Sequence, residues 1–188
     1  LDVLLHKKPV GKKVAIIGAG GIGFDVAEYL LHDPSTPLPI PLATWLGEWG
    51  IDLQAKQNGG LIKPEEAHPI RDIYLLQRKA SKVGAGLGKT SGWVHRATLQ
   101  RNKVHMLAGV DYQKIDDQGL HISVGGKTQV LDVDHVILCA GQESLTELMP
   151  TQANETGPRF HKIGGAALAS ELDAKRAIKE GAELAASL

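Results

Sequence analysis

The chain has 188 residues, a length that suits one domain of ordinary size or one domain with a fragment of a second. Apolar residues make up 43% of it, and 21 basic residues balance 21 acidic ones, so charge favours neither nucleic acid nor an anionic membrane as a partner. It has no run of about 18 apolar residues, and its eight histidines form no metal-binding motif, so we expect neither a membrane span nor a metal site.

The cysteine content indicates the compartment. The single cysteine, Cys139, excludes an internal disulfide and favours a reducing, cytoplasmic environment. No charged-then-apolar leader precedes the first strand, so the sequence gives no sign of secretion. Because the first residue is Leu1 rather than Met, we expect a further portion of the protein upstream.

The first part of the chain predicts a strand followed at once by a helix and then an insertion. Residues 13–17 are apolar and β-branched, and residues 21–31 carry apolar side chains at helical spacing. Residues 32–71 are rich in proline, with one short helical patch around Trp45, Leu46 and Trp49. The two tryptophans form either a hydrophobic plug that holds the insertion down or a contact for a substrate or partner.

The rest of the chain alternates strands and helices. We expect a strand at 73–76, a loop at 81–92, a helix at 91–101, a strand at 104–107, a meander at 110–132, a strand at 136–139, a loop at 142–160 and a final helix at 166–188. The apolar side of that last helix carries Leu168, Leu172, Ile178, Ala182 and Ala185. This order predicts an α/β fold, a Rossmann-like three-layer FAD/NAD(P)-binding fold with a central parallel sheet and a β-meander.

A glycine-rich turn joins the first strand to the first helix. Gly18, Gly20 and Gly23 match the pattern G-x-G-x-x-G in the strand-to-helix context that the motif requires, with Gly21 and Ile22 between them. Gly18 permits the tight turn, Gly20 lets the backbone approach a pyrophosphate, and Gly23 lets helix and strand pack closely. Because a helix N-terminus favours negative charge, we interpret this turn as a dinucleotide site rather than a turn used for packing alone.

The end of the second strand bears on which dinucleotide is bound. NAD sites place a carboxylate there, whereas this strand is followed by Arg78, Lys79 and Lys82, which suit the 2′-phosphate of NADPH. The cluster lies 55 residues beyond Gly23, where about 20 is usual, and the insertion accounts for the difference. A solvated strand end is the alternative for Arg78 and Lys79, and Arg96 on the next helix is a further candidate.

Three other features carry weaker signals. The run from Gly84 to Thr90 resembles a phosphate-binding P-loop, but its first glycine stands one residue too close, so we do not expect ATP binding. Ala140 and Gly141 close a buried strand at the sheet edge where ligands bind, and Cys139 before them is expected to be structural rather than redox-active. A second glycine-to-helix junction, Gly164-Gly165, is a candidate contact for an anion or a flavin.

Seven stretches together resemble the bacterial NADPH-dependent 2,4-dienoyl-CoA reductases, in the iron–sulfur flavoprotein branch of the old yellow enzyme family, which is related to trimethylamine dehydrogenase. They span nearly the whole chain, and 48–52 and 76–82 are the most specific. The others are 14–25, 86–93, 112–116, 139–143 and 171–174.

The resemblance implies a domain plan and a set of cofactors. Residues 1–142 would form the NADPH domain, and residues 143–188 would close a FAD domain whose first half lies upstream. FMN in a barrel and a four-cysteine 4Fe-4S cluster would also lie upstream. Hydride would pass from NADPH to FAD, and electrons would then pass through the cluster to FMN, which reduces an acyl-CoA substrate in unsaturated fatty acid β-oxidation. No catalytic residue is expected in this segment.

Two other functions remain open at this point. One is a stand-alone NADP-binding sensor or regulatory domain without catalysis. The other is a self-contained dehydrogenase, although no Tyr-x-x-x-Lys dyad follows the cofactor motif. A flavin-type glycine motif and a cysteine cluster upstream would exclude the sensor.

Overall fold

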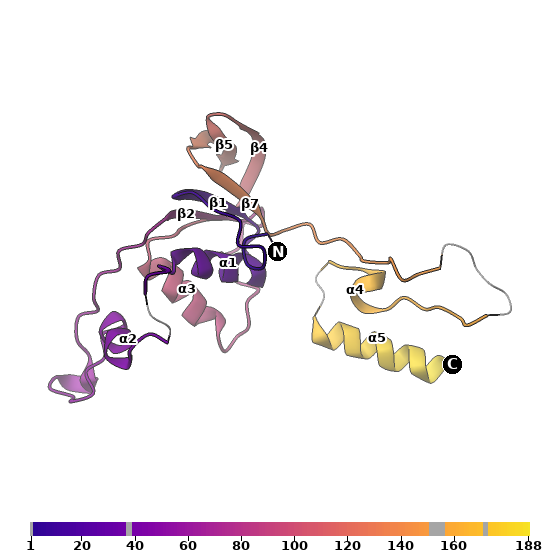
Figure 1. Cartoon of the computed structure of the whole chain (residues 1–188), viewed down its shortest axis with the longest axis horizontal. Helices are drawn as coiled ribbons and strands as arrows, with labels where there is room; N and C mark the ends of the chain where they lie inside the picture. The colour runs from indigo at the N-terminus through magenta and orange to yellow at the C-terminus, as the bar shows by residue number, and fades with distance from the viewer. Residues whose placement is uncertain (1, 37–38, 151–156, 171–172) are drawn as a thin grey trace. The chain divides into compact units, whose positions relative to one another are not determined.

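The computed structural model describes residues 2–36, 39–150, 157–170 and 173–188. The chain divides into two compact units, Leu1–Ala140, coloured indigo to orange in Figure 1, and Gly141–Leu188, coloured orange to yellow. Residues 151–156 of the expected loop, and Glu171 and Leu172 of the resembling stretch, lie outside the described residues.

A four-stranded parallel sheet forms the centre of the first unit. Its spatial order is β3-β2-β1-β7, and every neighbouring pair is parallel. The strands are β1 (Lys13–Ile17), β2 (Asp72–Leu76), β3 (His105–Leu107) and β7 (His135–Leu138). Because β1 is flanked by β2 on one side and β7 on the other, the chain reverses its direction of travel across the sheet at β1.

Helices cover one face of this sheet. Successive side chains of a strand point to opposite faces, and Val14 and Ile16 of β1 share a buried core with Phe24 and Leu99 from the two helices. Those helices are α1 (Gly21–Leu31) and α3 (Gly92–Arg101), drawn below the sheet in Figure 1.

An antiparallel meander covers the other face. Ala15 and Leu76 lie on that face and share a second core with Leu120 and Ile122. The meander consists of β4 (Val110–Asp116), β5 (Gly119–Val124) and β6 (Lys127–Leu131), with β5 in the middle. Helices, parallel sheet and meander form three layers, which confirms the predicted fold class.

The insertion forms a short helix, as its tryptophans predict. Helix α2 (Leu42–Trp49) is followed by a single 3-10 turn, η1 (Asn58–Gly60). The ring centroids of Trp45 and Trp49 are 6.1 Å apart, and the Arg101 guanidinium of α3 lies 4.9 Å from the Trp49 ring centroid. This cation–π contact attaches the insertion to the helical layer, although Trp45 remains 43% exposed.

The second unit differs from the sequence prediction. The single helix expected at 166–188 is wrong, because α4 (Gly164–Ala167) ends before Leu168 and α5 (Ala174–Ser187) begins after a new N-cap. The Asp173 side chain caps α5 by accepting the Arg176 N–H at 2.7 Å. Leu168 therefore does not share a helix face with Ile178.

In none of the described ranges does a helix have the length and apolar character needed to cross a membrane.

Candidate dinucleotide site

The candidate site lies where the parallel strands end. Ile17 of β1 lies opposite Leu76 of β2 and Leu138 of β7, so the three carboxyl ends are level. The glycine turn follows β1, the basic residues follow β2, and Cys139-Ala140 follows β7. In open parallel sheets, ligands bind at this edge, where the strand order reverses.

Gly18 and Gly23 hold the glycine turn together. Gly18 has φ +111° and donates its N–H to the Leu76 carbonyl at 2.9 Å. A Cβ on Gly18 would lie 2.6 Å from the Cys139 carbonyl oxygen, and one on Gly23 would overlap the Gly18 carbonyl oxygen. No side chain fits at either position, so both glycines serve the packing of turn, helix and strand.

Gly20 and Gly21 leave the backbone open. A Cβ at either position would have no atom within 4 Å, and both residues are exposed. Gly20 is the N-cap of α1, which has no side-chain cap and no acidic residue in its first turn. The N-terminal N–H groups near Gly21 and Ile22 thus face an open space, and this backbone cradle fits a pyrophosphate.

The turn after β2 presents the basic residues. This turn carries the exposed residues Arg78, Lys79 and Lys82, and β2 is the neighbour of β1, which leads into the glycine turn. Burial raises the pKa of the Tyr112 phenol on β4, and the positive charge of nearby Arg78 opposes that rise. Arg78 is therefore close enough to the half-buried Tyr112 ring for its charge to affect that phenol.

Arg96 has a different environment from the other three cations. It is half-buried on α3 and donates from Nη1 to the Gly84 carbonyl at 3.1 Å. Gly84 has φ +74°, and a Cβ there would lie 2.7 Å from the Phe24 ring. Arg96 thus ties the start of the 84–90 loop to α3, and Gly84 packs against Phe24 of α1.

Cys139 and Ala140 border the glycine turn from β7. The Cys139 N–H donates to the Ile17 carbonyl at 2.8 Å, and burial raises the pKa of its half-buried thiol. A raised pKa disfavours the reactive thiolate, which agrees with the structural role expected for this cysteine. Gly141, with φ +79°, begins the second unit.

The Gly164-Gly165 junction belongs to the second unit. Gly164 has φ +57° and donates its N–H to Glu180 Oε2 of α5 at 2.5 Å. Glu180 is in turn paired with Arg176 at 3.3 Å. The Gly164 N–H thus already has a carboxylate acceptor within the second unit.

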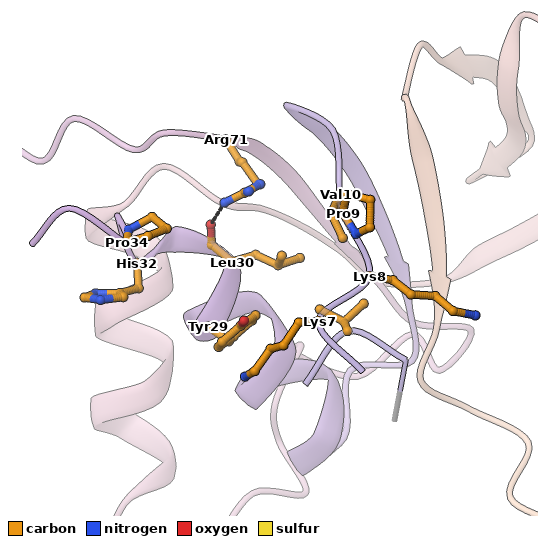
Figure 2. A pocket seen from close by; sticks show the side chains of 10 residues that line it. Lys7, Lys8, Pro9, Val10, Tyr29, Leu30, His32, Pro34 and Arg71 are labelled. Carbon is orange, nitrogen blue, oxygen red and sulfur yellow. Dashed lines mark hydrogen bonds between the residues drawn. The ribbon is translucent and has the colours of Figure 1, made fainter. Parts of the chain in front are cut away.

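A pocket at the opposite, amino-terminal edge of the sheet has a volume of about 250 Å³. Figure 2 shows Arg71 reaching the Leu30 carbonyl at the end of α1, at 2.7 Å. Lys7 lies 4.5 Å from the Tyr29 ring centroid, and Lys8 pairs with Asp2 at 3.0 Å. The pocket lies between the start of the chain and α1. Because Arg71, Lys7 and Lys8 each have a partner within the protein, we do not treat it as an alternative dinucleotide site.

Two contributors to the site were not identified from the sequence. Gln77 supports the basic turn through its side chain, and Tyr112 lies beside Arg78. No local pattern distinguishes a glutamine that binds backbone carbonyls from a solvated one. Tyr112 is 34 positions from Arg78 in the chain, so only the fold brings them together.

Comparison with known proteins gives a family and two relatives. A family model described as pyridine nucleotide-disulphide oxidoreductase matches residues 2–164. A metal reductase from Desulforamulus reducens is 26% identical over 147 residues, which covers 78% of this chain and 21% of that protein.

Among solved structures, a 2-naphthoyl-CoA reductase in complex with 2-naphthoyl-CoA superposes with a TM-score of 0.62 at 20% identity. The match covers 96% of this chain and 22% of that chain. At this identity the likeness shows a shared fold. The sequence spans about a fifth of the length of both relatives.

Proposed function

We propose that this chain, which belongs to the pyridine nucleotide-disulphide oxidoreductase family, takes its reducing equivalents from NADPH. Family membership makes it part of a flavoprotein oxidoreductase that binds FAD and NAD(P)H. Within that family, we propose that this protein prefers NADPH to NADH and that residues 1–142 form the domain that binds it.

One observation carries the proposal. The open backbone at Gly20 and Gly21 and the exposed basic turn at Arg78 follow neighbouring strands and lie at the same edge of the sheet. A dinucleotide has its pyrophosphate and its adenosine ribose at a fixed separation, and it needs a receptor for each. The helix N-terminus receives the pyrophosphate without side chains, and the basic turn receives the 2′-phosphate.

Different residues would bind different parts of the cofactor. Gly20, Gly21 and Ile22 present backbone N–H groups, while Arg78 offers a guanidinium fork and Lys79 and Lys82 add point charges. Arg96 would contribute indirectly, because it holds the Gly84 carbonyl at the start of the 84–90 loop. Ala140 lies at the same strand ends, where we place the nicotinamide half of the cofactor.

Bound NADPH supplies a hydride, and FAD is its acceptor in this family. The residues described here bind and orient. No catalytic acid, base or nucleophile is assigned, because Cys139 has a raised thiol pKa and the 188 residues contain no second cysteine with which to form a redox disulfide. The task of the first unit is to hold the nicotinamide in position.

For the whole protein, we propose a reductase of the 2,4-dienoyl-CoA type. Residues 143–188 would contribute to its FAD domain, with Gly164 and Gly165 near the flavin, and FMN and a 4Fe-4S cluster would be held outside this sequence. The choice of an acyl-CoA substrate rests on the sequence resemblance. The 2-naphthoyl-CoA reductase likeness adds the fold and nothing about substrate.

Titration of the purified chain with NADPH and NADH tests the proposal. A charge-assisted hydrogen bond to the 2′-phosphate is worth about 1.5–3 kcal/mol, so NADPH should bind roughly ten- to hundredfold more tightly. The fragments 2′,5′-ADP and 5′-AMP should show the same difference, because they differ only in the 2′-phosphate. Equal affinities for both pairs would contradict the NADPH assignment, and absence of binding to all four would contradict the dinucleotide site.

A further inference from the structure

Gln77 occupies the first position after β2 and turns its half-buried side chain back under the basic turn. Its Nε2 donates to the Lys79 carbonyl at 2.9 Å and to the Ser81 carbonyl at 2.6 Å. A glutamine amide nitrogen carries two hydrogens. Both are therefore used on the backbone of the turn that carries Arg78.

The backbone of Gln77 is itself fixed. Its N–H donates to the Leu107 carbonyl and its carbonyl accepts the Val110 N–H, both at 3.0 Å. The Lys79 carbonyl also accepts the Gly109 N–H at 3.0 Å. The turn is thus held at its base by residues 107–110 and from inside by one side-chain amide.

This arrangement fixes the backbone that carries the cationic side chains. The carbonyls of Lys79 and Ser81 point inward at the amide, and the side chains of Arg78, Lys79 and Lys82 remain exposed. A guanidinium binds a phosphate through a planar fork, so its contribution depends on orientation. If the turn moved freely, it would lose conformational entropy each time it bound the 2′-phosphate.

We propose that Gln77 is a positioning residue for cofactor selection, which holds the 78–81 turn so that Arg78 meets the 2′-phosphate. The inference rests on the proposed preference for NADPH and adds a residue that bears no charge and touches no ligand. Gln77 should therefore act mainly on the affinity for NADPH, because NADH lacks the 2′-phosphate that Arg78 would receive.

The test compares the NADPH and NADH dissociation constants of Gln77→Met, which keeps the length of the side chain and removes both donors. NADPH affinity should fall about tenfold, the usual weight of a well-placed charged hydrogen bond, and NADH affinity should change less than about twofold. The ratio of the two constants is measured on one sample, so a partly unfolded fraction cancels from it. Gln129→Met, an exposed glutamine on β6, is the matched control and should keep the original ratio.

Two further variants complete the design. Gln77→Asn keeps the amide but is one methylene too short to reach both carbonyls, so it should also lose selectivity and serves if Gln77→Met does not fold. In the double variant with Arg78→Ala, removal of Gln77 should cost no more than about twofold in additional selectivity, because both residues act on one contact.

The outcomes separate this inference from the function on which it rests. If the unmutated chain prefers NADPH and Arg78→Ala removes the preference while both Gln77 variants keep it, the positioning role is overturned and the proposed function stands. If the unmutated chain binds both nucleotides equally, both proposals fall.

Discussion

The turns after β1 and β2 reach the same edge of the sheet but are built in opposite ways. The first turn depends on the absence of side chains, because a Cβ at Gly18 or Gly23 would collide with a backbone carbonyl. The second is held by a side chain that is present, because Gln77 donates to two carbonyls of its own turn. The first presents backbone N–H groups to a ligand, and the second presents cations.

This difference separates binding from selection. Every dinucleotide has a pyrophosphate, so a receptor made of backbone binds NADH and NADPH alike. Only NADPH has a 2′-phosphate, so the cationic turn can discriminate between them. Substitutions in the two turns should therefore have different effects. Three of them and one substitution in the meander follow, in order of the size of the expected effect.

Gly23→Ala should have the largest effect, and on the fold itself. The new Cβ would overlap the Gly18 carbonyl oxygen, and Gly18 cannot withdraw because its N–H is bound to the Leu76 carbonyl. We expect a loss of about 3 kcal/mol of unfolding free energy, which is typical of severe overpacking. Urea unfolding measures it. Gly86→Ala is the control, because a Cβ at Gly86 has no atom within 4 Å, and the same midpoint for both variants would contradict the packing role.

Gly20→Val should leave the fold intact and remove binding. The space beside Gly20 is open, so the valine fits the protein and occupies the place of the pyrophosphate. We expect both nucleotides to lose at least about hundredfold in affinity, or roughly 2.7 kcal/mol. Circular dichroism and titration on the same sample test both halves, with Ala43→Val on the exposed side of α2 as control. Retained binding would mean that the glycine turn serves packing alone.

Arg78→Ala should affect one nucleotide only. Loss of the guanidinium should weaken NADPH binding by about tenfold or more, while NADH binding changes less than about twofold. Calorimetry with each nucleotide measures the change, and Lys56→Ala in the exposed part of the insertion controls for loss of one positive charge. If NADH binding fell in parallel, the turn would belong to general binding and the contrast between the two turns would disappear.

Much of this fold follows from local sequence. The strand at 13–17, the helix at 21–31 and the glycines between them agree with the structure because each depends on neighbours in the chain. The helical patch at Trp45 and Trp49 and the meander at 110–132 agree for the same reason.

The rest depends on polar contacts that the spacing of apolar residues does not predict. The helix expected at 166–188 is interrupted because Asp173 caps a new helix, a competing local signal that apolar spacing alone does not reveal. The Gly164 N–H is taken by Glu180, 16 positions away. The Arg96 contact with the Gly84 carbonyl depends on how α3 packs beside the 84–90 loop. Gln77 binds carbonyls two and four positions along the chain, but no local pattern distinguishes it from a solvated glutamine.

The smallest expected effect is on the stability of the meander, whose residue Val110 donates its N–H to the Gln77 carbonyl at the base of the turn after β2. Asp116, where β4 ends, accepts from Lys114 at 2.7 Å, from His121 at 2.8 Å and from the Gln118 N–H at 3.0 Å. These contacts hold the pKa of the Asp116 carboxyl well below its usual range, with Lys114 as the largest cause. A carboxyl with a lowered folded-state pKa stabilises the protein above its unfolded value of about 3.9, and the stabilisation is lost as pH falls further.

Acid unfolding of Asp116→Asn should therefore differ from that of the unmutated chain in one window. Near neutral pH the variant should melt at a slightly lower temperature, and the gap should narrow as pH falls below about 4, because the unmutated carboxyl then takes up a proton as well. Asp117→Asn is the matched control, since Asp117 lies next in the chain and makes none of these contacts. If the difference in melting temperature did not vary with pH, the stabilisation would come from the geometry of the Asp116 side chain and not from its charge.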